Sequence, residues 1–393
     1  MIRYTLMILV LAIVVMGIPR LPQADCWDHS VAKTCAGENE RSFQGETAEE
    51  AKHTNAHGTF EEPAEEVAIP ILCYHRFDDT CSSTYAVTPT VFEDQMEYLR
   101  RNGFHSISLK TLSDYVSGSL DALPPRPVVI TIDDGWKSAY TKAAPILKEK
   151  GFTATFFVYT YFISSCRDSL SWDDLKILLK DGFEVGSHTK SHPNLLLLRK
   201  RLDPDEYRKR VLEELEDSRK LLDERLNTSV SLFSYPYGLY DSHLENKIGE
   251  CGYKVAVTTN PCPNSRGSNR LRLSRFTVLQ EYTLDDFSRV VTSRVLLTEA
   301  QIPKDSSRIK DRRPLISAKI VDEDIDRSSL RMRLGETVLG ATFNPTTGKF
   351  SHQITKDLKE RAHLVTISAR DKATRKLKLT SWLFIVETPP EKR

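Results

Sequence analysis

Strand-like and helix-like runs alternate over more than half of this chain. Short apolar runs rich in β-branched residues recur at 67–75, 107–109, 127–130, 154–158, 183–185, 229–233, 254–258 and 271–278. Helical spacing of apolar residues marks 92–103, 112–116, 138–150, 172–180, 203–226 and 244–251. The many charges of the segment at 203–226 are interpreted as the solvated face of its helix. Strands that alternate with helices predict an α/β fold, a parallel sheet or barrel with crossover helices.

Two adjacent aspartates follow the strand predicted at 127–130. They stand in the run Asp133-Asp134-Gly135. In a parallel fold the loops after the carboxyl ends of the strands build the functional site. Two neighbouring carboxylates at a buried strand end are costly unless they share a cation, so one interpretation is a divalent metal site. The other is an Asp-Gly turn that only ends the strand.

Two histidines follow another strand-like run. His188 and His192 are four residues apart, so a single helical turn would point both imidazoles at one ion. With Asp134 they would supply one oxygen and two nitrogens and leave a fourth position for water, the pattern of a catalytic zinc-type site. Asp133 would then be free to take a proton from that water. Zinc is favoured, and nickel, cobalt or iron also suit these ligands.

Three stretches, taken together and in order, resemble the motifs of the polysaccharide deacetylase family. They are 131–135, 187–193 and 233–238, with Ile132 where phenylalanine is common and a third motif that lacks its usual arginine. The family comprises metal-dependent esterases that share the NodB-homology domain (carbohydrate esterase family 4), and the poly-N-acetylglucosamine deacetylase-like branch is the most similar. The resemblance covers roughly 67–291. It implies a distorted (β/α) barrel that removes N-acetyl groups from poly-N-acetylglucosamine, a chitin-like polymer or peptidoglycan.

The resemblance also implies roles for individual residues. Asp133 matches the general base, and Asp134, His188 and His192 match the metal ligands. The backbone N–H of Tyr237 matches an oxyanion-hole donor.

The general acid has no direct match. The family's late motif commonly supplies a histidine, and the corresponding region at 271–276 has none. His75 is the candidate, because the pair Tyr74-His75 resembles the start of the poly-N-acetylglucosamine deacetylase branch; a structural histidine that bonds a backbone carbonyl is the alternative. Arg275 could hold Asp133 ionised through a charge-assisted bond, or it could be a surface arginine on an edge strand.

The pattern changes after about residue 294. Short alternating runs at 316–321, 330–334, 337–343, 350–354, 363–369 and 376–386 predict a small all-β sandwich, which resembles bacterial immunoglobulin-like modules. The whole chain is thus predicted to consist of five segments. They are a signal peptide or N-terminal anchor at 1–25, a flexible acidic linker at 26–66, the barrel at 67–295, a second linker at 296–313 and the sandwich at 314–393.

The first residues indicate an exported protein. Arg3 precedes an apolar run at 6–18, as in a secretory signal, and attachment to a membrane through this segment is left open. The chain is therefore expected in the periplasm, the cell envelope or the extracellular space. There its seven cysteines permit disulfides, with Cys26/Cys35, Cys73/Cys81 and Cys251/Cys262 nearest in sequence. Lys+Arg 55 against Asp+Glu 54 gives no basic field for nucleic acid, and a monomer is expected.

Two other functions compete with that of a polysaccharide deacetylase. A glycan-binding or scaffolding protein would have no physical reason to keep the whole Asp-Asp-His-His set, although the missing late histidine favours it. An amide hydrolase that acts on a small molecule would need a closed pocket, whereas a polymer needs a long open groove.

Overall fold

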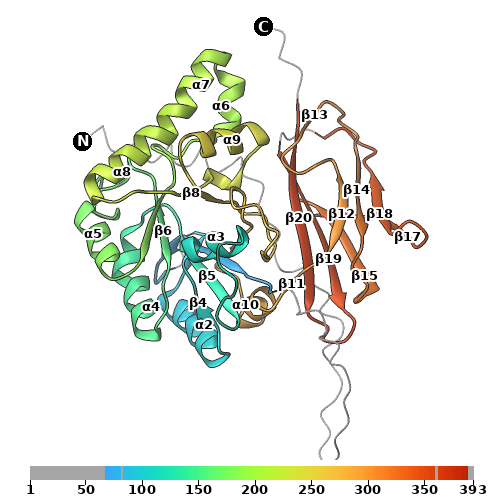
Figure 1. Cartoon of the computed structure of the whole chain (residues 1–393), viewed down its shortest axis with the longest axis horizontal. Helices are drawn as coiled ribbons and strands as arrows, with labels where there is room; N and C mark the ends of the chain where they lie inside the picture. The colour runs from blue at the N-terminus through green and yellow to red at the C-terminus, as the bar shows by residue number, and fades with distance from the viewer. Residues whose placement is uncertain (1–66, 81–82, 359–361, 388–393) are drawn as a thin grey trace, which may run out of the picture.

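The computed structural model describes residues 67–80, 83–358 and 362–387, and these form an α/β unit followed by an all-β unit (Figure 1). The signal or anchor and the acidic linker expected at 1–66 lie outside the described residues, as do Cys26, Cys35 and Cys81. No helix within the described ranges has the length and apolarity needed to span a bilayer.

A parallel sheet forms the centre of the α/β unit. Its strands lie in the order β10 (Phe276–Thr277), β1 (Ile71–Tyr74), β5 (Pro127–Ile132), β6 (Thr155–Val158), β7 (Glu184–Ser187), β8 (Leu232–Ser234) and β9 (Val255–Val257), and β4 (His105–Ser106) also pairs with β5. The segment before β10 bonds back to β9, since the Leu273 N–H donates to the Ala256 carbonyl at 2.9 Å. The sheet thus curls round on itself, and the predicted distorted (β/α) barrel is confirmed.

Helices connect these strands and cover the sheet. They are α2 (Pro89–Arg101), α3 (Leu109–Val116), α4 (Ala144–Lys150), α5 (Trp172–Lys180), α6 (Leu195–Arg201), α7 (Pro204–Leu212), α8 (Ser218–Leu226), α9 (Ser242–Glu250) and α10 (Leu284–Val291). Helix α5 has the bounds that its spacing predicts, because a Ser171–Asp174 capping box starts it and Asp181-Gly182 follows it. The helix predicted at 203–226 is α7 and α8 joined by a π-helical turn, η4 (Glu213–Asp217).

The all-β unit consists of two sheets. One has the order β11 (Arg294–Val295), β20 (Leu377–Val386), β19 (Ala362–Asp371), β15 (Ile325–Leu334) and β16 (Thr337–Leu339), and β13 (Arg308–Ile309) also pairs with β20. The other has the order β12 (Thr298–Ile302), β14 (Leu315–Ile320), β18 (Lys349–Gln353) and β17 (Thr342–Asn344). Buried side chains from both sheets, among them Ile316, Met332 and Trp382, form one core. The predicted all-β unit is confirmed, and its likeness to immunoglobulin-like modules stays a prediction.

The segment expected as a linker at 296–313 contains strands β12 and β13. Its polar composition concealed them, because both strands pair through their backbones while most of their side chains are exposed or half-buried.

Strand β20 is buried on both faces and belongs to two cores. Trp382 and Phe384 point into the core of the sandwich, whereas Leu379, Leu383 and Ile385 pack with the side chains of the barrel. Alternate side chains of a strand point to opposite faces, so one strand can serve both cores. Figure 1 shows β20 on the side of the sandwich that faces the barrel.

The described cysteines are reduced. Cys73, Cys251 and Cys262 are buried free thiols, and Cys166 is exposed and free. Cys251 and Cys262, named as a pair nearest in sequence, therefore do not pair in this structure, and Cys81, named as the partner of Cys73, lies outside the described residues.

Candidate metal centre

The ends of strands β5, β7 and β8 place the predicted site residues at one edge of the sheet. β5 ends at Ile132, β7 at Ser187 and β8 at Ser234, and all their pairings along the order β5-β6-β7-β8 are parallel. The chain leaves each strand in the same direction, so the aspartates, the histidines and the loop at 235–241 meet above this edge.

Asp134, His188 and His192 bring three potential metal ligands together. Their ligand atoms all lie within 4.8 Å of one another. The Nε2 atoms of the two histidines are 3.0 Å apart, and Oδ1 of Asp134 is 3.7 Å from Nε2 of His188 and 3.6 Å from Nε2 of His192. Ligands bound at 2.0–2.2 Å in a tetrahedron are separated by about 3.3–3.6 Å. The donor set therefore fits a small divalent cation with one position left over.

Neighbouring groups orient two of these ligands. Nδ1 of His188 donates to the Ser234 carbonyl at 2.7 Å, which leaves the lone pair of Nε2 facing the other donors. The indole N–H of Trp136 donates to Oδ2 of Asp134 at 3.3 Å, so Oδ1 remains directed at the histidines. Burial and, after it, the nearby His188 lower the pKa of His192 to about 4, against the opposing effect of Asp134 and Asp133. His192 is thus neutral at pH 7, the form that binds a metal.

The two histidines do not lie on a helical turn, and this part of the sequence interpretation was wrong. Residues 188–192 form an irregular loop in which Thr189 and His192 have φ of 72° and 58°. The Thr189 hydroxyl accepts a bond from the His192 backbone N–H at 2.9 Å. A tight loop with left-handed residues thus brings the imidazoles together, where a helix was expected.

Glu214 supports this loop through hydrogen bonds to its backbone, a role that the sequence did not reveal. It is fully buried, and its carboxylate accepts from the backbone N–H groups of Lys190 and Ser191 at 3.0 and 2.8 Å. Arg210 pairs with the same carboxylate at 2.7 Å. The charge run at 203–226 is therefore only partly a solvated face. The only indication in the sequence is that Glu214 stands at helical spacing from apolar residues. A single sequence does not distinguish such a buried glutamate from an exposed one.

Asp133 lies beside the three ligands and is bound by Arg275. Two guanidinium nitrogens of Arg275 donate to the Asp133 oxygens at 2.8 and 2.7 Å, and the Ser234 hydroxyl donates at 3.0 Å. Oδ2 of Asp133 is 3.8 Å from Nε2 of His188. Burial by itself would raise the pKa of Asp133, but the charge and hydrogen bonds of Arg275, together with the nearby His188, hold it below its ordinary value. Asp133 is therefore an ionised carboxylate in contact with the ligand cluster.

Arg275 is completely buried, so it is not a surface arginine on an edge strand. Its five N–H groups all have acceptors, because it also donates to the Thr258 carbonyl at 2.7 Å and to the hydroxyls of Thr131 and Ser234 at 3.0 Å each. An arginine held by this many bonds fixes the orientation of the carboxylate that it binds.

His75 lies near Asp133, in a second group of potential ligands. Ligand atoms of His75, Cys73 and Asp133 lie within 4.8 Å of one another. Nδ1 of His75 is buried and has no hydrogen-bond partner among the described residues, so a bond from this atom to a backbone carbonyl is not present. Burial holds the pKa of His75 below its ordinary value, although Asp134 and Asp133 oppose this effect.

Tyr237 extends the site along the loop after β8. It adopts a left-handed conformation with φ 61° and ψ 9° inside a short 3-10 turn, η5 (Pro236–Gly238). Its ring packs on His192 with centroids 4.8 Å apart, and Tyr159 packs on the same imidazole at 5.3 Å. Next to Tyr237, a Cβ on Gly238 would lie 2.0 Å from the Thr259 hydroxyl, so only glycine fits there. The turn is thus fixed both by its backbone and by close packing.

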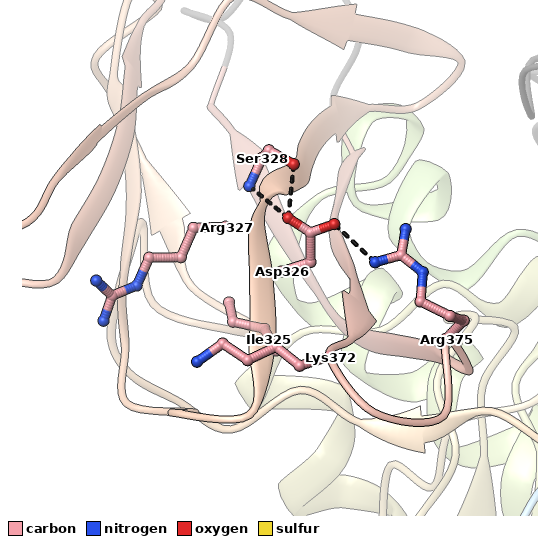
Figure 2. A pocket seen from close by; sticks show the side chains of 6 residues that line it. All are labelled: Ile325, Asp326, Arg327, Ser328, Lys372 and Arg375. Atoms are coloured by element: carbon pink, nitrogen blue, oxygen red, sulfur yellow. Dashed lines mark hydrogen bonds and ion pairs between the residues drawn. The ribbon is translucent and has the colours of Figure 1, made fainter.

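An open hollow on the sandwich contains none of these residues. Its lining includes Arg327 and Lys372, and Figure 2 shows Asp326 bonded to Ser328 and Arg375. Asp326 is thus already paired with a cation, Arg375, at 2.8 Å. The ligand donors converge at the barrel edge and not in this hollow.

Comparisons with known proteins match the barrel. A family model described as polysaccharide deacetylase matches residues 121–256. A Bacillus subtilis protein named as a polysaccharide deacetylase, YxkH, is 31% identical over 219 residues, which are 56% of this chain and 73% of that protein. A poly-beta-1,6-N-acetyl-D-glucosamine N-deacetylase of Staphylococcus aureus strain MRSA252 is 27% identical over 199 residues, 49% of this chain and 68% of that protein. The Streptococcus pyogenes deacetylase PplD, solved with acetate, superposes with a TM-score of 0.51 at 27% identity, over 57% of this chain and 99% of that one.

Proposed function

This chain belongs to the polysaccharide deacetylase family, and on that premise we propose that it hydrolyses the N-acetyl groups of a poly-N-acetylglucosamine-type polysaccharide and releases acetate. The observation that carries the proposal is the convergence of Asp134, His188 and His192 beside an ionised, arginine-bound Asp133. The choice of polymer follows the activity named for the Staphylococcus aureus relative.

A divalent ion, which we propose is zinc, would be held by Asp134, His188 and His192, where it would polarise the acetamide carbonyl and lower the pKa of a bound water. Asp133 would accept a proton from the attacking water, since its Oδ2 faces the ligand cluster. Arg275 would keep this carboxylate ionised and correctly oriented.

Two further residues would serve the tetrahedral intermediate and the leaving group. The backbone N–H of Tyr237 would donate to the carbonyl oxygen as negative charge develops on it. His75 would deliver a proton to the departing amine, because it lies beside Asp133 and its Nδ1 is not engaged by another group among the described residues. This assignment supplies the general acid that the region at 271–276 lacks.

The test is acetate release from β-1,6-linked N-acetylglucosamine oligomers, chitin oligomers and peptidoglycan, measured with and without a chelator. We expect release from the β-1,6-linked oligomers, loss of activity on chelation and recovery when zinc is added back. Asp133→Asn provides the matched control, since it changes one oxygen of the proposed base to an amide nitrogen. No release from the β-1,6-linked oligomers, or equal release by Asp133→Asn, would overturn the proposal.

We also propose that the protein is exported and works outside the cytoplasm. The support is the charged start and apolar run at 3–18, together with a polymeric substrate of the cell surface. Fractionation of cells that produce the full chain tests this, because recovery of the protein with the cytoplasm alone would contradict it.

A further inference from the structure

The sandwich contacts the barrel at the loop that carries Tyr237. The segment that leads into β13 lies between β20 and this loop: the Ser306 N–H donates to the Leu383 carbonyl at 2.7 Å, and the Ser242 N–H donates to the Ser306 carbonyl at 3.2 Å. The loop after β8 thus continues directly into contacts with the second unit.

Asp305 anchors the loop through Tyr240. The Tyr240 hydroxyl, on a side chain that is 1% exposed, donates to Oδ1 of Asp305 at 2.7 Å. The backbone N–H of Leu383, in β20, donates to the same oxygen at 3.0 Å. Oδ2 of Asp305 pairs with Arg272 of the barrel at 3.3 Å. One carboxylate of the sandwich segment therefore joins strand β20 to the barrel loop three positions after Tyr237.

The same tyrosine connects Asp305 to the proposed catalytic base. Its hydroxyl oxygen accepts from the side-chain amide of Asn260 at 2.8 Å. The carbonyl of Asn260 accepts from the backbone N–H of Arg275 at 3.0 Å, and Arg275 holds Asp133 through two bonds. Hydrogen bonds thus connect Asp305 to Asp133 through Tyr240, Asn260 and Arg275, with the covalent frames of Asn260 and Arg275 linking one bond to the next. Tyr240 and Asn260 are both buried.

A second contact holds the end of the loop. Nε of Arg308, at the start of β13, donates to Oδ2 of Asp241 at 2.8 Å. Asp241 is completely buried, and its Oδ1 caps helix α9 by accepting from the Leu244 N–H at 2.8 Å. A buried carboxylate needs such a partner, so this pair fixes where the loop ends.

We propose that Asp305 and Arg308 of the sandwich are positioning residues, which hold the Tyr237 loop and Arg275 in the geometry that the reaction needs. The sandwich is then part of the hydrolytic unit. The proposal rests on the proposed function for its effect on turnover, while the ordering of the loop can be measured without any substrate. Small displacements of oxyanion donors and bases lower kcat steeply. The loss of the contacts made by Asp305 and Arg308 should therefore affect kcat more than KM.

Tyr240→Phe in the full chain is the first test, because it removes only the hydroxyl that joins Asp305 to Asn260. We expect kcat on a β-1,6-linked N-acetylglucosamine oligomer to fall by roughly 10–100-fold. KM should change by less than about twofold, and bound metal should stay constant. Tyr98→Phe is the control, since it also removes a single tyrosine hydroxyl, one that bonds to Ser288 at 2.7 Å between helices α2 and α10.

Hydrogen exchange of the loop amides gives a readout that does not depend on activity. In Tyr240→Phe, peptides covering 235–244 and 270–277 should exchange roughly 10-fold faster than in the parent chain, because their bonds open more often. The same peptides should be unchanged in Tyr98→Phe.

Conservative substitutions separate positioning from general stability. Asp305→Asn keeps an oxygen that can accept from Tyr240 and should retain kcat within about threefold, whereas Asp305→Leu, of similar size, should resemble Tyr240→Phe. Arg308→Gln should speed exchange of the loop, whereas Arg375→Gln, which breaks an arginine–aspartate bond of equal length inside the sandwich, should not.

Each outcome decides the proposal. Unchanged hydrogen exchange in Tyr240→Phe and Asp305→Leu overturns the proposal that these contacts order the loop, whatever the activity. Faster exchange with unchanged kcat overturns their role in the reaction. If the parent chain releases no acetate from any oligomer, the proposed function fails, and exchange together with metal content still decides whether the sandwich orders the site.

Discussion

Replacement of Arg275 by methionine should destabilise the protein strongly, and the cause should be traceable to Asp133. Both side chains are buried, Arg275 completely and Asp133 with 2% exposed. Methionine would remove both guanidinium bonds and leave the Asp133 carboxylate with the Ser234 hydroxyl and the Cys73 thiol as its remaining donors. Breaking a buried ion pair by removal of one partner costs about 3–5 kcal/mol, because the remaining charge stays buried without compensation.

A double-mutant cycle shows whether this cost comes from the pair itself. In the double variant Arg275→Met/Asp133→Asn neither charge remains. Its loss of unfolding free energy should therefore be smaller, by about 1–3 kcal/mol, than the sum of the losses in the two single variants. Urea unfolding of the metal-stripped proteins is the assay, since a metal that binds only the folded state would add its own stabilisation. Arg313→Met is the control, because its pair with Asp357 is 63% exposed on the arginine side and should contribute at most about 1 kcal/mol.

The reasoning would be refuted by either of two results. One is a loss of unfolding free energy in Arg275→Met no larger than in Arg313→Met. The other is strict additivity in the cycle, which would mean that Arg275 acts through packing or through its bonds to Thr131 and Thr258 and not through Asp133.

Two further predictions concern packing around the site. Gly238→Ala should cost about 2–5 kcal/mol and lower kcat, because its Cβ would lie 2.0 Å from the Thr259 hydroxyl and would also be strained at positive φ. Gly151→Ala, also at positive φ but with nothing within 4 Å, should cost only about 1–2 kcal/mol and leave kcat unchanged. Leu383→Ala should lower the unfolding free energy by about 2–5 kcal/mol. It should shift the thermal unfolding of barrel and sandwich together, since β20 contributes side chains to both cores. A shift confined to one of two resolved unfolding transitions would contradict this.

The barrel could be predicted because its signals are local. The run at 127–130 is continuously apolar, as a strand with both faces covered must be, and it lies within β5 (Pro127–Ile132). Helix α5 carries its own start and stop signals. The order of Asp133, Asp134, His188 and His192 along such a fold was enough to predict that they meet, because parallel strands deliver their ends to one edge.

The parts that sequence reasoning left open or missed depend on partners distant in the chain. For Arg275 the sequence offered both a bond to Asp133 and a surface position, and it did not decide between them because Asp133 lies 142 positions earlier. Glu214 belongs to a charged run and yet supports the histidine loop, since the side of the helix that it occupies is set by packing. The contact of Asp305 with Tyr240 joins two units whose association the sequence does not encode locally.

The central claim is that Asp134, His188 and His192 hold the ion while Asp133 accepts a proton from the water bound to it. Metal content measured together with acetate release in two variants tests this claim most directly. Asp133→Asn should bind one equivalent of metal as the parent chain does and lose activity by about 10²–10⁴-fold, because only the base is removed. His188→Ala should lose both metal and activity. Equal loss of metal in the two variants, or an active Asp133→Asn, would contradict the account.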